Sequence, residues 1–453
     1  MTECNQSQME FAAHFSRRVV AEFSGAQLTT EGGALLLRAT DGKVGLLRRV
    51  VSCFSDARDP QRIEHELSEM LAQRIYGLAL GYEDLNDHEQ LRHDPLLGML
   101  AGRRDLDAPL AGKSTLNRLE LTPVGSPAAE RYNKIGYCAA ALDELLVDLF
   151  LEAHRQAPRE IVLDLDATDT PLHGRQEARF FHGYYGHYCY LPLYIFCGDH
   201  LLCARLRPSN IDASAGSLAE VQRIVRQIRA RWPKTRIILR ADSGFCREEL
   251  LAWCEHNAVD YVFGFARNKR LRQIIGRAMQ QAKQEHQRTG KAARVFCEFA
   301  YRTKKSWSRA RRVVGKAEQI EGKENPRYLV TSLGKEAWSA QKLYEQLYCA
   351  RGEMENRIKE QLSLFADRLS TETLRANQLR LYFSSLAYVL LEALRRLGLA
   401  GTEWAQAQAD TIRLKLLKIA AQVHITARRI WVRYSSAYPW QNIFAVAWAA
   451  LRC

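Results

Sequence analysis

Continuous and alternating apolar runs place a strand-rich segment in the middle of the chain. Five of these runs predict strands, over residues 161–168, 190–197, 201–208, 235–242 and 260–266. Gly198 and Asp199 separate the second run from the third, which predicts a hairpin. Apolar residues at helical spacing over 214–232 and 247–257 predict helices on either side of the fourth strand. The order β-β-β-α-β-α-β predicts a mixed sheet in which the fourth strand lies parallel beside the first.

The segments on both sides of this sheet are predicted to be mainly helical. Residues 62–82 carry apolar residues near helical spacing, and the basic segment 113–120 predicts a short helix that packs on the protein or faces DNA. A long helix is predicted over 339–365. The predicted regions are a helical N-terminal region (1–155), a first part of the core (156–269), a β-rich basic insertion (270–338), a second part of the core (339–400) and a C-terminal basic region, also helical (401–453).

Charge is the feature of the composition that adds most to this picture. The 453 residues are 47% hydrophobic and 26% charged, which is typical of a soluble globular protein with one large core or two to three domains. The net charge of +14 and the isoelectric point near 9.3 favour a polyanionic partner, either nucleic acid or an anionic membrane. Charge that only keeps the protein soluble is the alternative interpretation.

No part of the sequence predicts a membrane segment. The first residues lack the charged and apolar regions of a signal peptide, and no apolar run approaches the ~20 residues of a spanning helix. The 11 cysteines show no spacing typical of zinc sites, which suits a reducing compartment. We therefore expect a cytoplasmic protein whose polyanionic partner is nucleic acid.

Acidic residues interrupt the first predicted strand, "IVLDLDATDT". Asp164 and Asp166 share one face of that strand, where ionised carboxylates cost several kcal/mol unless they are paired or bind metal. Asp242 ends the fourth predicted strand. If this strand lies parallel beside the first, the aspartates converge at the carboxyl edge, where ligands of such sheets collect. A polar turn at each strand end is the alternative interpretation.

A third acid on the long predicted helix would complete a site for two divalent cations. Tyr348, Arg351 and Glu355 are three and four residues apart and share a helix face, so Glu355 could bind metal while Arg351 and Tyr348 hold a phosphate backbone. Magnesium prefers oxygen ligands, and two such ions support phosphoryl transfer. A surface ion pair between Arg351 and Glu355 is the alternative interpretation.

Four motifs in this order resemble DDE transposases of the IS1380 family, within the wider IS4-like group. The motifs are "LDLDATD", "HGRQ…YYGHYCYLPL", "RADSGFCREELLAWCE" and "YCARGEMENRIKE", and the resemblance runs from about residue 15 to the C-terminus. It implies an α/β fold with a ribonuclease-H-like mixed-sheet catalytic core, a β-rich insertion before the last catalytic helix, and helical N- and C-terminal regions. It also implies that residues 1–155 bind DNA ends.

The resemblance assigns roles to individual residues. Asp166, with Thr168, matches the first Asp-x-Thr motif, Asp242 the second acid and Glu355 the third, so these are the expected catalytic metal ligands. Asp164 is a further candidate ligand, and the choice between it and Asp166 as first acid stays open. Tyr348 and Arg351 match the Tyr-x2-Arg-x3-Glu signature. Leu362 stands where that signature continues with lysine, and Lys359 is the candidate substitute.

Other residues are candidates for DNA contact. Gln176 is expected to contact the DNA backbone. The densest group of cations is expected to follow phosphates and consists of Arg302, Lys304, Lys305, Arg309, Arg311 and Arg312. The aromatic run over 179–190 either stacks on an unpaired base or packs as a loop over the sheet.

The sequence therefore predicts a DNA transposase of an insertion sequence. Two Mg²⁺ ions, for which Mn²⁺ may substitute, would support strand cleavage at terminal inverted repeats and transfer of the 3′-OH into target DNA. The expected partners are double-stranded element ends and target DNA, bound by a homodimer at the bacterial nucleoid. The alternatives are a DNA-binding protein with decayed catalysis and a nuclease without strand transfer. A glycosidase fits poorly with the basic charge.

Overall fold

The computed structural model describes residues 8–25, 27–123 and 125–452, which divide into two compact units. Unit 1 combines the described residues of Met1–Val51, Arg58–Leu119 and Ala393–Cys453. Unit 2 combines Ser52–Ala57 with the described residues of Glu120–Glu392. The predicted boundary at residue 155 lies inside unit 2 and does not separate the two units. The helix before it, Ala139–Glu152, packs in the core of unit 2. No described helix has both the length and the apolar character that crossing a membrane requires.

Unit 1 is helical and carries two small antiparallel sheets at its surface. Its helices are α1 (Leu35–Val44), α2 (Leu46–Val51), α3 (Leu67–Leu80), α4 (His88–Leu91), α5 (Pro95–Ala101), α6 (Lys113–Glu120, whose last residue belongs to unit 2), α15 (Ala409–Ile412) and α16 (Gln441–Arg452). Its strands are β1 (Met9–His14), β2 (Arg17–Ala21), β3 (Leu28–Thr29), β18 (Ala421–Ile425) and β19 (Ile430–Tyr434). The helices predicted over 62–82 and 113–120 are confirmed by α3 and α6.

The prediction that residues 401–453 are all helical is wrong. β18 and β19 form an antiparallel hairpin, and β3 from the N-terminal part pairs with the start of β18. The reason is visible in the pattern: Val423, Ile425, Ile430 and Val432 alternate with polar or aromatic residues, which is a strand period. The hairpin β1–β2 likewise departs from the helical prediction for the N-terminal region.

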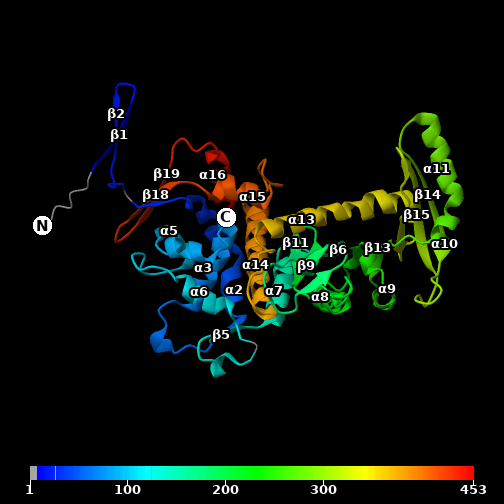
Figure 1. Cartoon of the computed structure of the whole chain (residues 1–453), viewed down its shortest axis with the longest axis horizontal. Coiled ribbons are helices and arrows are strands. Elements are labelled where there is room, and N and C mark those ends of the chain that lie inside the picture. The colour runs from blue at the N-terminus through cyan, green and yellow to red at the C-terminus, as the bar shows by residue number, and fades with distance from the viewer. Residues whose placement is uncertain (1–7, 26, 124, 453) are drawn as a thin grey trace. The chain divides into compact units, whose positions relative to one another are not determined.

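Unit 2 is built on a nine-stranded mixed sheet whose main path runs β11-β10-β6-β12-β13-β17-β15-β14, with β16 beside β15. Figure 1 labels β6, β11, β13, β14 and β15 of this sheet. The first five strands in chain order are β6 (Glu160–Ala167), β10 (Leu193–Cys197), β11 (His200–Arg205), β12 (Arg236–Ala241) and β13 (Asp260–Phe265). β10 and β11 form the predicted hairpin, and β6 pairs parallel with β12. The predicted strand order is thereby confirmed, and this arrangement is a ribonuclease-H-like sheet.

Helices cover both faces of this sheet because side chains alternate along each strand. On one face, Leu163, Leu239 and their neighbours pack with α7 (Ala139–Glu152), α8 (Ser217–Arg231) and α9 (Glu248–His256). On the other face, a smaller apolar cluster holds the helical stretch that follows the last strand. Its fully buried members are Ile238, Val262, Val314, Leu329, Leu333, Leu343 and Leu347.

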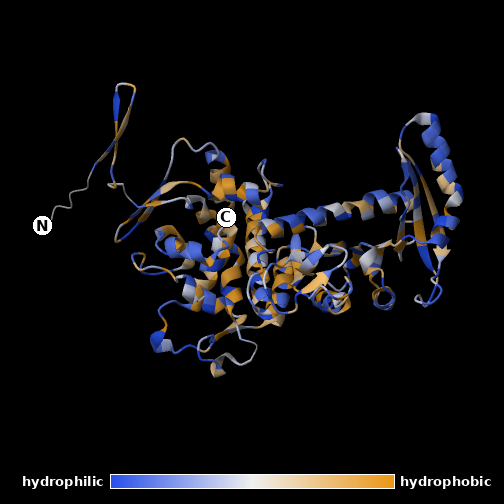
Figure 2. Cartoon of the chain, in the orientation of Figure 1, coloured by the Kyte–Doolittle hydropathy of each residue, from blue (hydrophilic) through white to orange (hydrophobic). Residues whose placement is uncertain are grey.

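The remaining elements of unit 2 lie at the margins of the main sheet. Two small sheets are formed by β4 (Phe54–Asp56) with β5 (Ile135–Tyr137), and by β7 (Thr170–Pro171), β8 (Phe180–His182) and β9 (His187–Tyr190). α14 (Leu374–Gly398) begins in unit 2 and continues into unit 1, and Figure 2 shows it as strongly hydrophobic, in keeping with its many buried residues.

The segment predicted as an insertion is β-rich but continues the central sheet. Its strands are β14 (Ala293–Tyr301), β15 (Arg311–Ile320), β16 (Lys323–Glu324) and β17 (Arg327–Thr331), and its helices are α10 (Lys269–Ile274) and α11 (Gly276–Thr289). β17 pairs antiparallel with β13, so backbone hydrogen bonds join this segment to the core. α11 packs against β14 and β15 and is largely hydrophilic (Figure 2).

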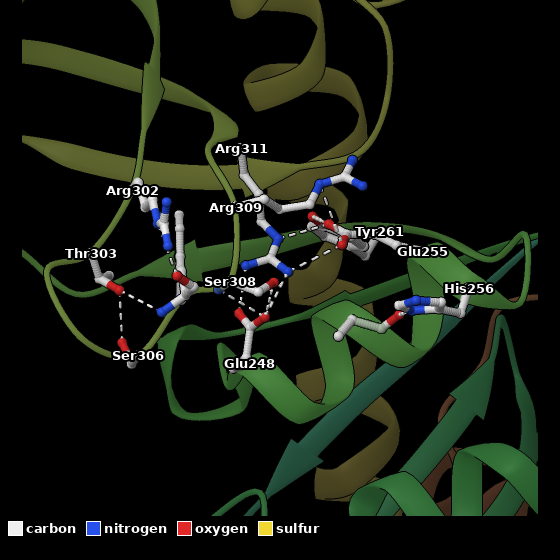
Figure 3. Close-up of polar contacts among 12 residues, drawn as sticks. Glu248, Glu255, His256, Tyr261, Arg302, Thr303, Ser306, Ser308, Arg309 and Arg311 are labelled. Carbon is white, nitrogen blue, oxygen red and sulfur yellow. Dashed lines mark hydrogen bonds and ion pairs between the residues drawn. The ribbon is translucent and has the colours of Figure 1, made fainter.

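A buried ion-pair group fastens β15 to α9 (Figure 3). The Arg311 side chain is 1% exposed and donates to Glu248 at 2.6 Å and to Glu255 at 2.7 Å. Tyr261 donates its hydroxyl to the same Glu255 at 2.8 Å. Arg309, two residues earlier, is 66% exposed and lies 3.6 Å from Glu255. Arg311 is therefore a structural residue, whereas its neighbour belongs to the surface.

We expect Arg311→Met to lower the free energy of unfolding by about 3–5 kcal/mol, because it leaves two partly buried carboxylates without their partner. Arg309→Met is the matched control and should change stability by less than about 0.5 kcal/mol. Urea denaturation of both variants measures the difference. Equal effects of the two substitutions would contradict the structural role of Arg311.

Candidate active site

The first two acids, Asp166 and Asp242, lie at the carboxyl ends of two neighbouring parallel strands, β6 and β12. In the register of β6 and β12, Leu165 faces Ala241; Asp166 is the next residue of β6, and Asp242 directly follows the end of β12. Asp242 caps the turn Ser243–Phe245 and accepts a hydrogen bond from the backbone N–H of Gly244 at 2.8 Å. Both carboxylates therefore lie at the carboxyl edge of the sheet, where ligands of such sheets collect.

An irregular helical stretch, rather than one continuous helix, carries the third acid. It consists of α12 (Ala340–Lys342), a π-helical turn (Leu343–Tyr348), a tight 3₁₀ turn (Cys349–Arg351) and α13 (Gly352–Ser363). The long helix predicted over 339–365 is confirmed over Ala340–Ser363, but its first part departs from regular α-helical geometry. Leu343 and Leu347 of the π-turn pack on the sheet, which holds the stretch against the face that bears the acids. Such π-segments are frequent at functional sites.

Arg351 bridges two of the three acids. Its Nη1 donates to Asp166 Oδ2 at 2.9 Å, and its Nη2 donates to Glu355 Oε1 at 2.9 Å. The side chains of Asp166 and Arg351 are 17% and 19% exposed, whereas that of Glu355 is 52% exposed. Arg351 thus joins the sheet edge to α13, with one end of the group open to solvent.

Burial shifts the pKa of two side chains at this edge, Asp166 and Tyr348. Burial, opposed by Arg351 and reinforced by the nearby Asp242, raises the pKa of Asp166 to about 6. Burial also raises the pKa of Tyr348, so its hydroxyl stays a hydrogen-bond donor at neutral pH.

Asp164 has a different setting from Asp166. It forms a two-pronged ion pair with Arg240 on β12, with Arg240 Nη2 at 2.7 Å from Asp164 Oδ2, and the two side chains are 5% and 7% exposed. Arg240 Nη1 also donates to the backbone carbonyl of Leu347 in the π-turn. Asp164 and Arg240 therefore tie β6, β12 and the irregular helical stretch together.

A pocket of about 820 Å³ opens beside the acids. Asp242, Tyr348 and Arg351 line one part of it, and cationic side chains line another. These cations are Arg267, Lys323 and Arg327, none of which forms an ion pair with any residue in the described ranges. No local motif in the sequence points to them, because they lie on the segment after β13 and on the strands β16 and β17.

Gly264 on β13 allows two parts of the site to approach closely. A Cβ atom at this position would lie 2.7 Å from the hydroxyl of Tyr348 and 2.9 Å from the backbone nitrogen of Ser243. Such distances are too short for any side chain, so only glycine permits this packing between β13, the turn after Asp242 and the π-turn.

The aromatic run over 179–190 forms the hairpin β8–β9 rather than an irregular loop. Tyr184 at its tip is 86% exposed and lines the pocket. Burial and the charges of Asp169 and Asp166 raise the pKa of Tyr185 to about 12, which places this ring near the acids. His187 binds Asp169 at 2.7 Å, so that aspartate already has a partner.

The other predicted DNA-contacting residues have varied settings. Lys359 is exposed on α13, and the amide of Gln176 lies 3.5 Å from the carbonyl of Leu369. The exposed members of the basic group are Arg302, Lys304, Lys305 and Arg309. Arg311 is buried as described above. Arg312 pairs with Glu298 at 2.6 Å and donates to two backbone carbonyls, so neither of these two side chains faces outward as a free cation.

The residues at this edge suit hard divalent cations, although no three described His, Cys, Asp or Glu side chains are close enough together to hold a metal. Asp166, Asp242 and Glu355 supply only carboxylate oxygens, the ligands that Mg²⁺ prefers. The guanidinium of Arg351 pairs with both Asp166 and Glu355 and compensates one of their two negative charges, so the carboxylates of this edge carry an excess of negative charge.

We expect Asp164→Asn to lower the free energy of unfolding by about 3 kcal/mol or more, because the buried Arg240 loses its charged partner. Asp166→Asn, the matched change two residues along the same strand, should cost less than about 1 kcal/mol, since Arg351 keeps Glu355. Urea denaturation at pH 7 without divalent ions compares the two variants.

The pH dependence separates these variants further. Because the pKa of Asp166 is raised above that of an unfolded aspartate, its charged form destabilises the fold, so wild type should lose stability relative to Asp166→Asn as pH rises from 4 to 7. If Asp166→Asn lost more stability than Asp164→Asn, Asp166 would be the structural aspartate and Asp164 the candidate metal ligand.

Comparisons with known proteins identify the family of the chain. A family model described as transposase DDE domain group 1 matches residues 11–453. No curated protein sequence matches the chain significantly. Among solved structures, the chain is similar to a piggyBac transposase synaptic complex with hairpin DNA, at 10% sequence identity and a TM-score of 0.42, covering 95% of this chain and 84% of that one.

Proposed function

Because the chain belongs to the transposase DDE domain group 1 family, we propose that it moves an insertion sequence by Mg²⁺-dependent cleavage and joining of DNA. The proposed reaction cuts strands at the terminal inverted repeats and transfers the freed 3′-OH into target DNA. We assign the narrower membership, in the IS1380 family, on the motifs around Asp166, Asp242 and Glu355. The proposed setting is the bacterial nucleoid.

One observation supports the assignment of the acids above all others. Asp166 and Asp242 hold equivalent positions on paired parallel strands, and Arg351 connects Asp166 to Glu355 through two 2.9 Å contacts. The pairing of the two strands and the two contacts of Arg351 support assigning these three acids, which are far apart in the sequence, to one site. Asp164 is left out of the catalytic set because Arg240 already neutralises it in the core.

In this proposal Asp166, Asp242 and Glu355 hold two Mg²⁺ ions, for which Mn²⁺ can substitute. When bound, such ions activate a water or hydroxyl nucleophile and stabilise the leaving oxygen. Asp166 is half-buried on a strand, so its carboxylate is proposed to hold the ions in a fixed position. Glu355 is exposed on α13, so its carboxylate is free to change its orientation and is proposed to complete the ligand set from the other side.

Arg351 is proposed to act both as an internal counterion and as a phosphate ligand. Without DNA, it pairs with Asp166 and Glu355 and compensates one of their two negative charges. A DNA phosphate in the pocket would offer Arg351 a bidentate partner with the same charge as a carboxylate. If Arg351 moved to this phosphate, the acids would be free to bind metal. Tyr348, which lines the same pocket and keeps its proton, would donate to the same strand.

The other cations of the pocket are proposed to hold the phosphates on either side of the cut. Arg267, Lys323 and Arg327 share the pocket with Asp242. A row of cations beside a group of acids suits a DNA strand whose flanking phosphates are neutralised by the protein while one phosphate lies at the acids. Two chains are expected to act together, because both ends of an element are cut.

The test is cleavage and strand transfer of DNA that carries the element ends. Asp166→Asn, Asp242→Asn and Glu355→Gln should each lower cleavage at least 10³-fold, with the binding of DNA kept, because each removes a proposed metal ligand. Gel analysis of labelled ends, with Mg²⁺ or Mn²⁺, measures both cleavage and joined products.

Glu345→Gln is the matched control, since it removes a carboxylate from the same helical stretch that faces Arg294 at 3.6 Å instead of the pocket. It should cleave as wild type does. Cleavage by Asp242→Asn at the wild-type rate would refute the assignment of the acids. Cleavage without joined products would favour a nuclease.

Arg351→Gln should have opposite effects on metal binding and on catalysis. Without DNA, removing the internal counterion should tighten Mn²⁺ binding several-fold, as measured by titration followed by electron paramagnetic resonance. With DNA, the loss of a phosphate ligand should lower the cleavage rate at least tenfold. Weaker Mn²⁺ binding by this variant would show that Arg351 orders the acids rather than competing with metal.

A further inference from the structure

The C-terminal ribbon, defined here as Ala421–Tyr434, carries an unusual concentration of positive charge. After Asp410 the sequence contains seven lysines and arginines and no aspartate or glutamate. Three of the arginines, Arg428, Arg429 and Arg433, lie in the ribbon, and their guanidinium groups form no ion pair with any residue that the structure describes. A strand pair without acidic neighbours is an unneutralised cationic surface.

The ribbon is fixed at its base and free at its tip. Ala421 and Val423 are buried, β3 pairs with β18 at Ala421 and Gln422, and the N–H of Val423 donates to the carbonyl of Gln27 at 2.9 Å. Every residue from His424 to Trp431 is exposed. The three residues of each strand beyond the paired part span about 10 Å at ~3.4 Å per residue. Figure 1 shows β18 and β19 extending as a narrow hairpin from the helices of unit 1.

A tight turn presents two of the arginines at the tip. Thr426 N–H donates to the carbonyl of Arg429 at 2.9 Å, and the N–H of Arg429 donates to Thr426 Oγ1 at 3.0 Å. Arg428 lies inside this turn, and Arg429 is the residue that closes it. The turn therefore holds their backbone in place, so little order has to be gained on binding.

The two faces of the ribbon differ. Gln422, His424, Trp431 and Arg433 share one face, because they are register partners across the strands. On that face Trp431 is 44% exposed, and the guanidinium carbons of Arg429 and Arg433 lie 5.8 Å and 5.9 Å from its ring centre. An aromatic ring between two cations offers both stacking and charge to a nucleic acid.

We propose that the C-terminal ribbon inserts into the major groove of double-stranded DNA, with Arg428 and Arg429 on guanine edges or flanking phosphates. The major groove is wide enough for a two-stranded ribbon and about 8.5 Å deep, close to the length of the free part. Arginine is the residue that most often contacts guanine in this groove. The proposal rests on the function proposed above and adds a second DNA-binding surface, on unit 1, to the pocket of unit 2.

The experiment compares DNA binding and cleavage by the full-length protein and its variants. Arg428→Ala/Arg429→Ala should weaken binding of end-containing duplex DNA about tenfold at 0.15 M salt and lower the salt slope of log K by about 2. It should also remove protection of guanine N7 from methylation at a short block of base pairs. Fluorescence anisotropy and methylation protection give the two readouts.

Two further variants separate the explanations. Arg155→Ala/Arg159→Ala removes the same charge from exposed positions near the start of β6, the end opposite the acids, and should leave binding unchanged. Arg428→Lys/Arg429→Lys keeps the charge but loses the planar fork, so it should keep the salt slope and lose guanine protection. Thermal unfolding of each variant within a few degrees of wild type verifies the fold.

Unchanged affinity and protection in the alanine variant would overturn the proposal, as would an equal loss in the Arg155/Arg159 control. A change in sedimentation with unaltered DNA affinity would assign the ribbon to contact between protein copies instead. Wild-type protein that protects guanines through the ribbon yet cuts no DNA would keep this proposal and refute the catalytic one.

Discussion

The parallel pairing of β6 with β12 is the constraint on which the placement of the acids depends. Apolar residues on both strands bury the pair, and the cross-strand ion pair of Asp164 with Arg240 fixes its register. A slip of one residue would turn every side chain of a strand to the other face. Asp166 would then point into the core and Asp242 would face a leucine, so the register decides whether the two acids meet.

Arg240 extends this constraint to a segment more than 100 residues later in the chain. Besides Asp164, it contacts the carbonyl of Leu347, which lies in the π-turn before Arg351 and Glu355. Burying such an ion pair costs desolvation, so its contribution is positional more than stabilising. The π-turn and the 3₁₀ turn then set the direction in which α13 leaves the sheet.

The sequence was sufficient for the strand order but not for the local geometry of the helical stretch. Buried strands appear as apolar runs, and the aspartates that interrupt them could therefore be placed on one edge. Nothing in the residues from Leu343 to Tyr348 distinguishes a π-turn from an α-turn, because their spacing fits both. Arg267, Lys323 and Arg327 could not be found either, since only the paired strands around the pocket bring them together.

The basic run around Arg311 shows why charge in a sequence does not by itself locate a binding surface. Its arginines look alike, yet Arg311 neutralises two acids that lie some 60 residues earlier, whereas Arg309 stays at the surface. Arg205, Arg240 and Arg312 are paired in the same way. Each internal ion pair removes one cation from the surface and leaves the net charge of +14 unchanged. The excess of positive charge therefore lies in segments that lack acidic residues. The residues after Asp410 are such a segment, and there the position of an arginine, rather than its number, determines what it can bind.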